Sequence, residues 1–478
     1  MSRAPAYRLG AHTRRGADGL LLAGGWPPRC LRLSEAGAAA LDAALDGGTA
    51  VTDAPPLPAD GLAEAPGAAA LVRRLVAYGM LDPVAGPGEA ELTFVVPVRD
   101  GGAALGALVA DLVPDGAVIV VDDGSRDDSA EVARHAGATV IPNEGAPGPA
   151  GARNTGWRRA STEFVAFIDA DCLVDGDWAR PLAGLLADDP ELALAAARVR
   201  GKTGSGRLAR WERTRSPLDM GSAAGLVGPD RRVSFVPSAA LVARRSALVE
   251  LDGFAEELRV GEDVDLVWRA VAAGWSVRYA PEMVVRHPPR PTLAARARQH
   301  FDYGTSAAAL EHRHPGAAVP LRANRIMLPA ALLGLGSPGG ALFAGSTFAA
   351  LAASRSSAGR SGGVRDAVAG KAPHLGLAVA RLGLDAELIG GRELARALAR
   401  DWLPVTLLLA TRRGRARRLA LLALTVDAAT ATASDPTGAP FNALLRLADN
   451  AAYCAGLWRG ALAKRSARAI LPRGLPSG

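Results

Sequence analysis

The sequence predicts an α/β protein in three parts. A mainly parallel sheet covered by helices occupies residues 91–290, a small winged-helix-like domain precedes it in residues 1–88, and a helical, basic region follows in residues 291–478. The middle part alternates apolar runs with helical segments, which is the pattern of a parallel sheet. The first part holds a strand-like run and two amphipathic helices, and the last part is rich in alanine. A chain of 478 residues is too long for one ordinary core, so two or three domains are expected.

The composition is that of a folded protein in a reducing compartment. Hydrophobic residues make up 49% of the chain and charged residues 22%, so no disordered bulk is expected. Cys30, Cys172 and Cys454 lie far apart, and their spacing indicates neither a disulfide framework nor a zinc site. The N-terminus carries no apolar signal segment. We therefore expect a cytoplasmic protein.

The net charge of +7 hides an asymmetry along the chain. Residues 290–478 contain 25 Lys and Arg residues against 10 Asp and Glu residues, a balance of +15, and residues 1–289 therefore carry −8. Only the last part can favour an anionic surface. The first part lacks a dense basic face, so no nucleic-acid partner is expected.

Two helices are predicted in the first part. The first begins after Ser34, a plausible N-cap, and stops at Gly47–Gly48. The second covers about 67–80 and ends at Gly79. Their apolar positions form stripes on one side of each helix: Leu41, Leu45, Leu71, Leu75 and Met80. Together with a preceding strand, they predict a small winged-helix-like unit.

The middle part supplies strands and helices in turn. The predicted strands are 92–98, 117–123, 138–142 and the run that begins at Phe164, and the predicted helices are 101–112, 126–136 and 150–161. In such sheets, ligands bind beyond the carboxyl ends of the strands. Several acidic residues occupy these ends, so we expect them to converge.

The run FVAFIDAD ends a buried strand in two carboxylates. Asp169 and Asp171 lie on the same face, because side chains alternate along a strand. Two carboxylates aimed at one point suit Mg²⁺ or Mn²⁺, with water and phosphate completing the shell. On the residues alone, an ordinary polar strand end is an equally good interpretation.

Two loops beyond the strand ends also suit a nucleotide. In VVDDGSRDD, Asp122 or Asp123 can accept hydrogen bonds from a base N–H group or from ribose hydroxyls; the alternative is a turn with Ser125 as N-cap. The glycine-rich segment 145–156 does not match a dinucleotide-binding motif. Within it, Arg153 offers a forked donor for a phosphate or a carboxylate.

The segment GEDVDLVWRAVAAG starts a helix with acids in its first turn. The helix dipole favours the ionised forms there, so Asp263 can act as a general base toward a hydroxyl. Acids that only stabilise the helix are the alternative, and Asp265 fits that alternative better. His287 follows an apolar strand at 283–285 and is either a further metal ligand or a structural histidine.

The last part offers three candidate membrane contacts. Residues 326–354 carry no charge and are long enough to span a bilayer, although a buried helical hairpin is an equally good interpretation. The apolar segments 402–411 and 419–426 are each too short to span. The basic run RRGRARR between them can rest on anionic lipid headgroups or form a solvated helix face.

The order of these pieces resembles the family 2 glycosyltransferases with the GT-A fold. The motifs are PVRD, VDDGS, GARNTG, DAD, GEDxDLxWR and a terminal VxRH, and they cover about 200 residues. By this resemblance, Asp169 and Asp171 bind the metal and Asp263 is the catalytic base. The residues that would hold the nucleotide are Pro97, Val98, Asp100, Asp122 and Asp123.

The first part resembles the small peptide-binding domains that present precursor peptides to tailoring enzymes, through LRLSEAG, LDG, LVRRL and GMLDP. The three parts in this order resemble the mycofactocin-system glycosyltransferases. That resemblance implies an inverting transfer of β-1,4-linked glucose from UDP-glucose to a peptide-derived redox cofactor. A cell-envelope polysaccharide or polyprenyl-phosphate acceptor is the alternative.

Two other classes of protein fit the sequence less well. A nucleotidyltransferase needs a glycine-rich phosphate loop with a basic residue after the first strand, and PVRDGG is a poor version of it. A binding protein with a decayed site would be expected to have lost its acids, yet the acids of DAD and GED are intact.

Overall fold

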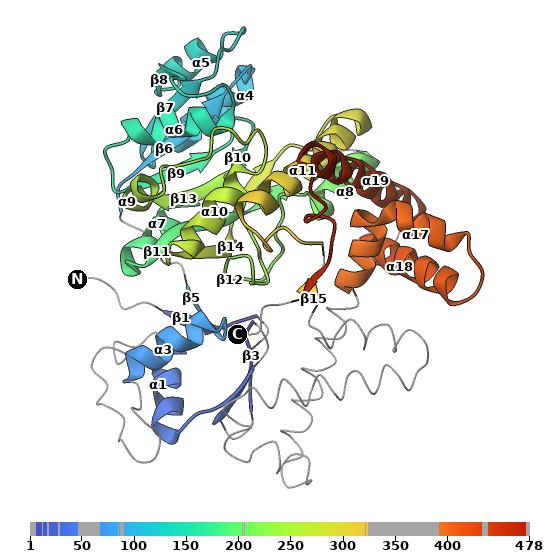
Figure 1. Cartoon of the computed structure of the whole chain (residues 1–478). Helices are drawn as coiled ribbons and strands as arrows, with labels where there is room; N and C mark the ends of the chain where they lie inside the picture. Colours follow the sequence, from blue (N-terminus) through green and yellow to red (C-terminus); the bar gives the residue numbers. More distant parts are fainter. Residues whose placement is uncertain are drawn as a thin grey trace. The chain divides into compact units, whose positions relative to one another are not determined.

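The computed structural model describes residues 6–11, 13–16, 19–26, 29–45, 67–84, 86, 90–202, 204, 206–320, 322–323, 392–432 and 438–474. The chain forms two compact units. The first comprises Met1–Val84, Pro320–Asp427 and Leu471–Gly478, and the second comprises Ala85–Val319 and Ala428–Ile470. Figure 1 shows the elements of both.

The N-terminal segment of the first unit contains two small sheets and two helices. A three-stranded antiparallel sheet and a two-stranded sheet flank α1 (Glu35–Leu45) and α3 (Ala68–Ala77). The strands are β2 (Arg14–Arg15), β3 (Leu21–Gly24) and β4 (Arg29–Arg32), then β1 (Tyr7–Leu9) and β5 (Leu81–Pro83). Their common core includes Leu22, Leu41, Leu75 and Met80. Both predicted helices of this segment are therefore confirmed.

The ends of these two helices show why they begin and stop where they do. The Gly37 N–H donates to Ser34 Oγ at 3.1 Å, so Ser34 is the predicted N-cap. Gly79 follows α3 with φ +68°, and the Met80 N–H donates to Leu75 O at 2.8 Å, which closes the last turn. The predicted stop at Gly47–Gly48 lies outside the described residues.

In the C-terminal part of the first unit, most of the described residues are helical. Its two short strands, β15 (Arg322–Ala323) and β16 (Arg473–Gly474), pair in parallel. The helical segments are η1 (Ala397–Asp401), α17 (Leu403–Ala410) and α18 (Arg415–Thr432), whose last residues belong to the second unit. The uncharged stretch 326–354 falls outside the described residues.

No helix in the described part of the chain combines the length and the apolarity needed to cross a bilayer.

The second unit is built on a nine-stranded sheet in the order β10-β14-β11-β13-β9-β6-β7-β8, with β12 paired to β14. Most of its strands run in one direction, as predicted: β6 (Leu92–Val98), β7 (Ala117–Asp122), β8 (Thr139–Pro142), β9 (Phe164–Ile168), β11 (Leu192–Gly201) and β14 (Ser276–His287). The strands of opposite direction are β10 (Leu173–Val174), β12 (Gly225–Leu226) and β13 (Ala240–Arg244).

Helices cover both faces of this sheet (Figure 1). One face packs against α4 (Gly102–Leu112), α5 (Ser129–His135) and α7 (Ala179–Asp188). The other packs against α6 (Pro149–Arg159), α9 (Arg245–Glu250) and α10 (Glu262–Ala272). Side chains along β6 point alternately to the two faces of the sheet. Phe94 and Val96 therefore belong to the core on the first face, and Val95 belongs to the core on the second.

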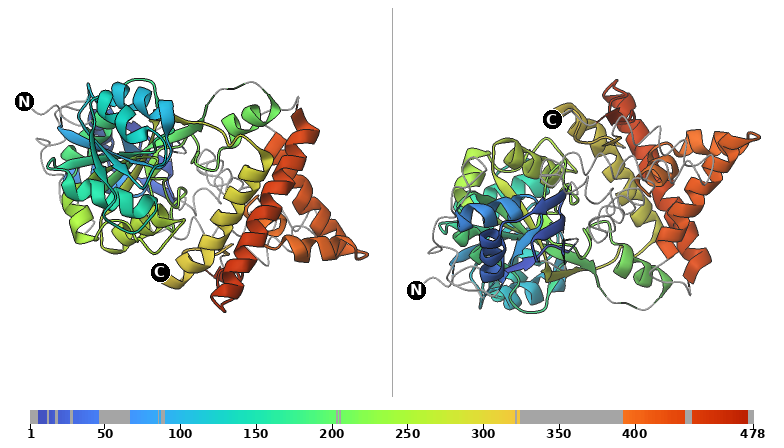
Figure 2. Two further views of the ribbon diagram at one scale, coloured as in Figure 1. Left: turned by 90° about the horizontal axis from the view of Figure 1, so that it is seen from above. Right: turned by 90° about the horizontal axis from the view of Figure 1, so that it is seen from below.

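Two long helices complete the second unit. α11 (Leu293–Arg313) and α19 (Ala439–Ala463) lie side by side, as both views of Figure 2 show. Their backbones approach so closely that a Cβ atom on Gly304, Gly456 or Gly460 would clash with a carbonyl oxygen of the facing helix. Buried Arg296 on α11 also pairs with Asp449 of α19, through two hydrogen bonds of 2.7 Å.

Candidate functional site

The predicted site residues converge at the carboxyl edge of the parallel strands. β6, β7 and β9 are neighbours in the sheet, and all three end at this edge. The strands are in register there, with Val98 opposite Asp122. Asp169 comes directly after β9, and Asp100 lies two residues beyond the end of β6. The loops that follow therefore meet above one region of the sheet.

Asp100 ties two of these loops together, and Asp122 holds a turn within one of them. Asp100 has φ +57°, and its Oδ1 accepts from the Arg126 N–H at 2.7 Å. Asp122 Oδ1 accepts from the Ser125 N–H at 2.9 Å, which forms a local turn. Asp100 lies on the surface and Asp122 is half-buried. Both carboxylates thus reach solvent at the strand ends, where a nucleotide is expected.

Asp123 has a different environment. Asn143 Nδ2 donates to its Oδ1 at 2.6 Å, and the Gly148 N–H donates to its Oδ2 at 2.9 Å. Both oxygens therefore hold the loop that leads into α6. Contact between Asp123 and a nucleotide stays a prediction. Each carboxylate oxygen of Asp123 already accepts one hydrogen bond, so a nucleotide would have to donate to its second lone pair.

Pro97 and Val98 can offer a ligand little more than backbone and apolar surface. The Val98 side chain is buried, and its carbonyl oxygen accepts from the Asp123 N–H at 2.9 Å. Pro97 is half-buried on the other side of the strand. Their predicted contact with the nucleotide remains untested by this geometry.

Arg153 is the centre of the charged part of the site. Its side chain on α6 is 3% exposed; one terminal nitrogen donates to Asp169 Oδ1 at 2.6 Å, and the other donates to Glu262 Oε1 at 2.8 Å. The guanidinium also lies over the Phe254 ring, 5.6 Å from its centroid. Arg153 therefore links the end of β9 to the start of α10. Its predicted contact with the donor stays a prediction.

Asp171 lies beside His287 at the carboxyl edge of the sheet, with His287 Nε2 3.3 Å from Asp171 Oδ1. The side chains of Asp169 and Asp171 are 30% and 44% exposed. His287 Nδ1 faces the Pro288 carbonyl oxygen at 2.8 Å, so this nitrogen must be the donor. In the neutral ring, Nε2 then directs a lone pair at a carboxylate oxygen.

This arrangement fits a divalent cation. A lone pair facing a carboxylate oxygen is repulsive unless a proton or a cation lies between them. Carboxylate oxygens with an imidazole nitrogen form a donor set compatible with Mn²⁺ or Mg²⁺. Within the part of the chain that the structure describes, no three His, Cys, Asp or Glu side chains are already grouped as a metal cage.

The first turn of α10 carries the candidate base. Gly261 has φ +88°, which turns the chain into the helix. Burial, and then the neighbouring Asp263, raise the pKa of Glu262 to about 7. Burial also raises the pKa of Asp263, although Arg153 opposes the shift. The two acids interact, so their titration belongs to the pair.

Asp263 is the more available acid of this pair. It is half-buried, whereas Glu262 is buried and engaged by Arg153. Its Oδ1 accepts from the Val264 N–H at 2.8 Å, and its Oδ2 accepts weakly from the Ser238 N–H at 3.4 Å. A carboxylate with few strong partners and a raised pKa is suited to take a proton.

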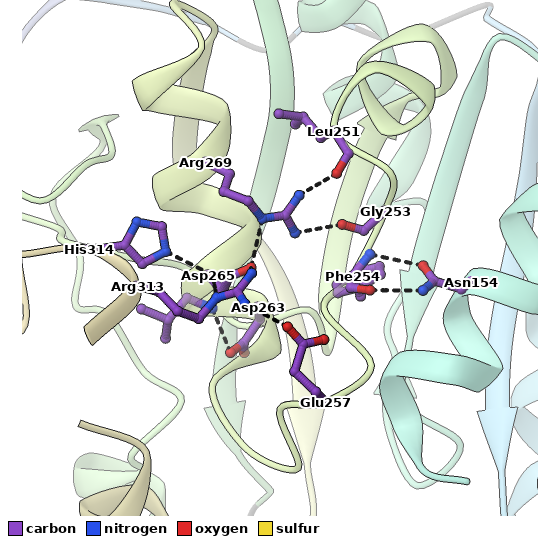
Figure 3. A network of polar contacts seen from close by, with 11 residues as sticks. Asn154, Leu251, Gly253, Phe254, Glu257, Asp263, Asp265, Arg269, Arg313 and His314 are labelled. Carbon is purple, nitrogen blue, oxygen red and sulfur yellow. Dashed lines mark hydrogen bonds and ion pairs between the residues drawn. The ribbon is translucent and has the colours of Figure 1, made fainter. Parts of the chain in front are cut away.

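Asp265 belongs to a separate network of ion pairs (Figure 3). Its fully buried carboxylate accepts from Arg269 Nε at 2.7 Å, Arg313 Nε at 2.6 Å and His314 Nε2 at 2.8 Å. Burial alone would raise the pKa of Asp265, but these hydrogen bonds outweigh it and hold the pKa far below its usual range. The structure thus agrees with the interpretation that sets Asp265 apart from the catalytic acids.

Two further groups at the site have roles that the sequence motifs do not show. Tyr303 on α11 accepts from Gln299 Nε2 at 3.1 Å, and burial with nearby Asp263 and Asp169 raises the pKa of Tyr303 above the usual phenol range. Asn154 holds the Phe254 backbone through two hydrogen bonds, of 2.8 and 2.9 Å (Figure 3). The approach of Tyr303 to Asp263 and Asp169 has no local signal, and neither has the contact of Asn154 with Phe254, because these partners lie far apart in the sequence.

Comparison with known proteins identifies the chain's relatives. The family model described as glycosyl transferase family 2 matches residues 93–251. The pre-mycofactocin glycosyltransferase of Mycobacterium tuberculosis is 35% identical, over 98% of this chain and 97% of its own length. An uncharacterized glycosyltransferase of Mycobacterium bovis is 33% identical, over 42% of this chain and 86% of its own.

Solved structures with a similar arrangement include a mannosyltransferase from Pyrobaculum calidifontis, determined in complex with GDP-Man and Mn²⁺. It is 19% identical, with a TM-score of 0.43, and the alignment covers 79% of this chain and 91% of that one. The matched family model and the sheet of the second unit confirm the predicted GT-A fold. The chain belongs to glycosyl transferase family 2 and, within it, to the family of the pre-mycofactocin glycosyltransferases.

Proposed function

We propose that this glycosyltransferase moves glucose from UDP-glucose to a peptide-derived redox cofactor, extending a β-1,4-linked chain with inversion at the anomeric carbon. The relative from Mycobacterium tuberculosis that carries the pre-mycofactocin name aligns over nearly the whole chain, which supports this acceptor. A cell-envelope polysaccharide or polyprenyl-phosphate acceptor is the second candidate, because other family 2 relatives include a poly-β-1,6-N-acetyl-D-glucosamine synthase.

One observation carries the proposal. Arg153 joins Asp169 at the end of β9 to Glu262 at the start of α10, and Asp263 follows directly. The acids suited to a metal and the acid suited to be a base therefore flank one buried cation. A single displacement requires this combination of a base and charge stabilisation for the leaving group.

The residues then have distinct roles. Asp263 takes the proton from the acceptor hydroxyl as its oxygen bonds to the anomeric carbon and the bond to the diphosphate breaks. Asp169, Asp171 and His287 would hold Mg²⁺ or Mn²⁺, which would neutralise charge on the leaving diphosphate. Pro97, Val98, Asp100, Asp122 and Asp123 bind the nucleotide side of the donor.

The remaining groups position these residues. Arg153 fixes Asp169 and Glu262, and it faces the region where the donor phosphates are expected. Tyr303 stays protonated, so its hydroxyl can donate a hydrogen bond beside Asp263.

The location of the enzyme is also part of the proposal. We place it in the cytoplasm, in peripheral contact with a membrane surface. The positive balance of residues 290–478 and the exposed basic run at 412–418 support this contact.

The test is metal-dependent donor binding. Calorimetry with a panel of nucleotide sugars, with and without Mn²⁺ or Mg²⁺, should single out UDP-glucose. Asp169→Asn and Asp171→Asn should each abolish the metal-dependent binding and leave the fold intact by circular dichroism. Asp175→Asn is the matched control, because this nearby aspartate is 60% exposed and pairs with Arg286. Undiminished binding in both site variants would refute the metal site.

A further inference from the structure

The turn between α17 and α18 combines positive charge with exposed apolar side chains. We propose that this docking tip, residues 403–422, binds the surface of a bilayer that contains anionic lipid. The inference deepens the peripheral membrane contact proposed above by naming the surface and the lipid. It is independent of the sugar that the enzyme transfers.

The charge of the docking tip is uncompensated. All five arginines of the run are exposed, and none of their guanidinium groups has a hydrogen-bond or ion-pair partner among the described residues: Arg412, Arg413, Arg415, Arg417 and Arg418. The nearest acids in the sequence, Asp401 and Asp427, are buried, at 2% and 5% exposure. The tip therefore presents five free positive charges in seven residues.

Apolar side chains flank the same turn on both sides. Five of them are between 44% and 56% exposed: Val405, Leu407 and Leu408 on α17, and Leu421 and Leu422 on α18. Exposed leucines scattered singly need no explanation, but a group beside free arginines does. Together they supply the two contributions on which binding to a bilayer interface depends, apolar area to bury and attraction to anionic lipid.

The turn itself is a defined structure. The N–H groups of Thr411 and Arg412 donate to Leu408 O and Leu409 O at 3.3 and 3.1 Å, which closes α17. Gly414 has φ +85°, and a Cβ atom there would meet nothing within 4 Å. Glycine is therefore favoured here by the backbone conformation and not by close packing. The Arg418 N–H then donates to Gly414 O at 3.4 Å as α18 begins. The two helices meet at this turn and diverge from it, as the orange ribbons in Figure 2 show.

A lipid surface fits both properties of the tip. Arginines attract anionic headgroups, and the leucines gain by leaving water for the acyl boundary. A nucleic acid would use the arginines and leave the leucines exposed.

The experiment is vesicle flotation of the full-length protein. Vesicles of phosphatidylcholine alone should bind weakly, and vesicles with added phosphatidylglycerol should bind strongly and lose the protein at high salt. Each basic residue near an anionic surface raises the constant for partitioning onto vesicles about fivefold. The triple change Arg412→Ser, Arg413→Ser and Arg415→Ser should therefore lower this constant about 100-fold. The matched control changes three exposed arginines elsewhere, Arg134→Ser, Arg210→Ser and Arg298→Ser, and should shift it much less.

The leucines are tested separately. Leu407→Ser with Leu408→Ser should lower partitioning at least about tenfold, through lost apolar burial. Val249→Ser with Leu293→Ser, 58% and 55% exposed, is the control and should change nothing. In addition, the emission of Leu408→Trp should shift to the blue when anionic vesicles are added.

Each outcome bears on a different statement. If the wild type does not float with vesicles of either composition, the proposed membrane contact and the proposed role of the docking tip are both wrong. If it floats and the tip variants float equally well, another surface makes the contact. Dependence on the arginines alone, with competition by duplex DNA, would indicate nucleic-acid binding instead. Sugar transfer in solution should be unchanged in all variants, because none of the changed residues belongs to the site.

Discussion

At the scale of single residues, Arg153 holds the two acidic halves of the site together. A buried guanidinium is stable only beside counter-charges, and Asp169 and Glu262 supply them at 2.6 and 2.8 Å. In return, Arg153 keeps ionised carboxylates close together where they would otherwise repel. Asp263, the next residue, is thereby left available beside a positive charge. We therefore expect chemistry to depend on Asp263 and geometry to depend on Arg153.

The first prediction concerns the acid pair of α10. Asp263→Asn should bind the donor as the wild type does and lose about 10²–10⁴-fold in transfer, because the general base is gone. Glu257→Gln is the control, since this acid is 64% exposed and pairs with Arg313 on the outside of the network. Near-normal transfer by Asp263→Asn, with a dead Glu262→Gln, would mean that Glu262 is the base.

The pKa values of Glu262 and Asp263 also predict how kcat/KM falls on the acid side of the pH profile. Burial raises the pKa of Glu262 to about 7 and raises the pKa of Asp263 as well. The base must be ionised, so kcat/KM should fall as pH drops below the apparent pKa of the pair. Glu262→Gln removes a like charge and should move this limb to lower pH. A pH-rate profile of both proteins checks the direction.

At the scale of elements, α10 serves two purposes from one turn of helix. Glu262 and Asp263 point to the site, while Asp265 points to α11 and the segment after it, where Arg313 and His314 lie (Figure 3). The buried network around Asp265 fixes the helix that carries the base. A substitution in this network should therefore lower the stability of the fold and also displace the residues of the site.

The prediction for this element is a loss of stability. Asp265→Asn should lower the free energy of unfolding by about 1.5–3 kcal/mol at neutral pH, because the fully buried carboxylate loses its charge-assisted hydrogen bonds to Arg269, Arg313 and His314, which are themselves partly exposed. Asp252→Asn, at a side chain 93% exposed, should change it by less than about 0.5 kcal/mol. Urea unfolding of both variants measures the difference.

The pH dependence of this loss follows from the sign of the pKa shift. The pKa of Asp265 is lowered in the folded protein, so its contribution is complete above the usual aspartate pKa and is lost as pH falls toward the lowered one. The gap between wild type and Asp265→Asn should therefore narrow in acid. A gap that stays constant down to strong acid would contradict the network's role.

Sequence patterns predict the elements with strong local signals. β6 and β9 are runs of Val, Phe and Ile, and α10 begins with acids and has an apolar side, so all three were predictable. β11 reads LALAAARVRG, which favours helix as much as strand, and only its pairing with β13 and β14 makes it a strand. The short strands β10 and β12 likewise depend on pairing with β14, which is distant in the sequence.

The site divides in the same way. The acids at strand ends are visible because a parallel sheet brings those ends together. The role of Arg153 is not visible, since its partners Asp169 and Glu262 lie 16 and 109 residues away. Nor does any motif show that Asp123 supports the loop before α6. These contacts depend on tertiary packing, which no local pattern encodes.

At the scale of the whole molecule, the N-terminal segment has a core of its own. Leu22, Leu41, Leu75 and Met80 pack together, and none of the site residues belongs to this segment. Its resemblance to peptide-presenting domains suggests that it recruits the acceptor or a partner protein. The chemistry of transfer would then be the task of the second unit alone, and recognition of the acceptor would be shared.

The last prediction separates these tasks. An enzyme that lacks residues 1–88 should hydrolyse the donor at the wild-type rate, because the donor-binding acids and Asp263 all lie in the second unit. Its KM for the peptide-derived acceptor should rise, while transfer to a small hydroxyl acceptor, which needs no recruitment, should stay the same. Steady-state kinetics with both acceptors tests this split, and a melting curve shows whether the shortened chain is folded. Equal transfer to both acceptors would make the segment a structural appendage, and lost donor hydrolysis in a folded protein would mean that it supports the site itself.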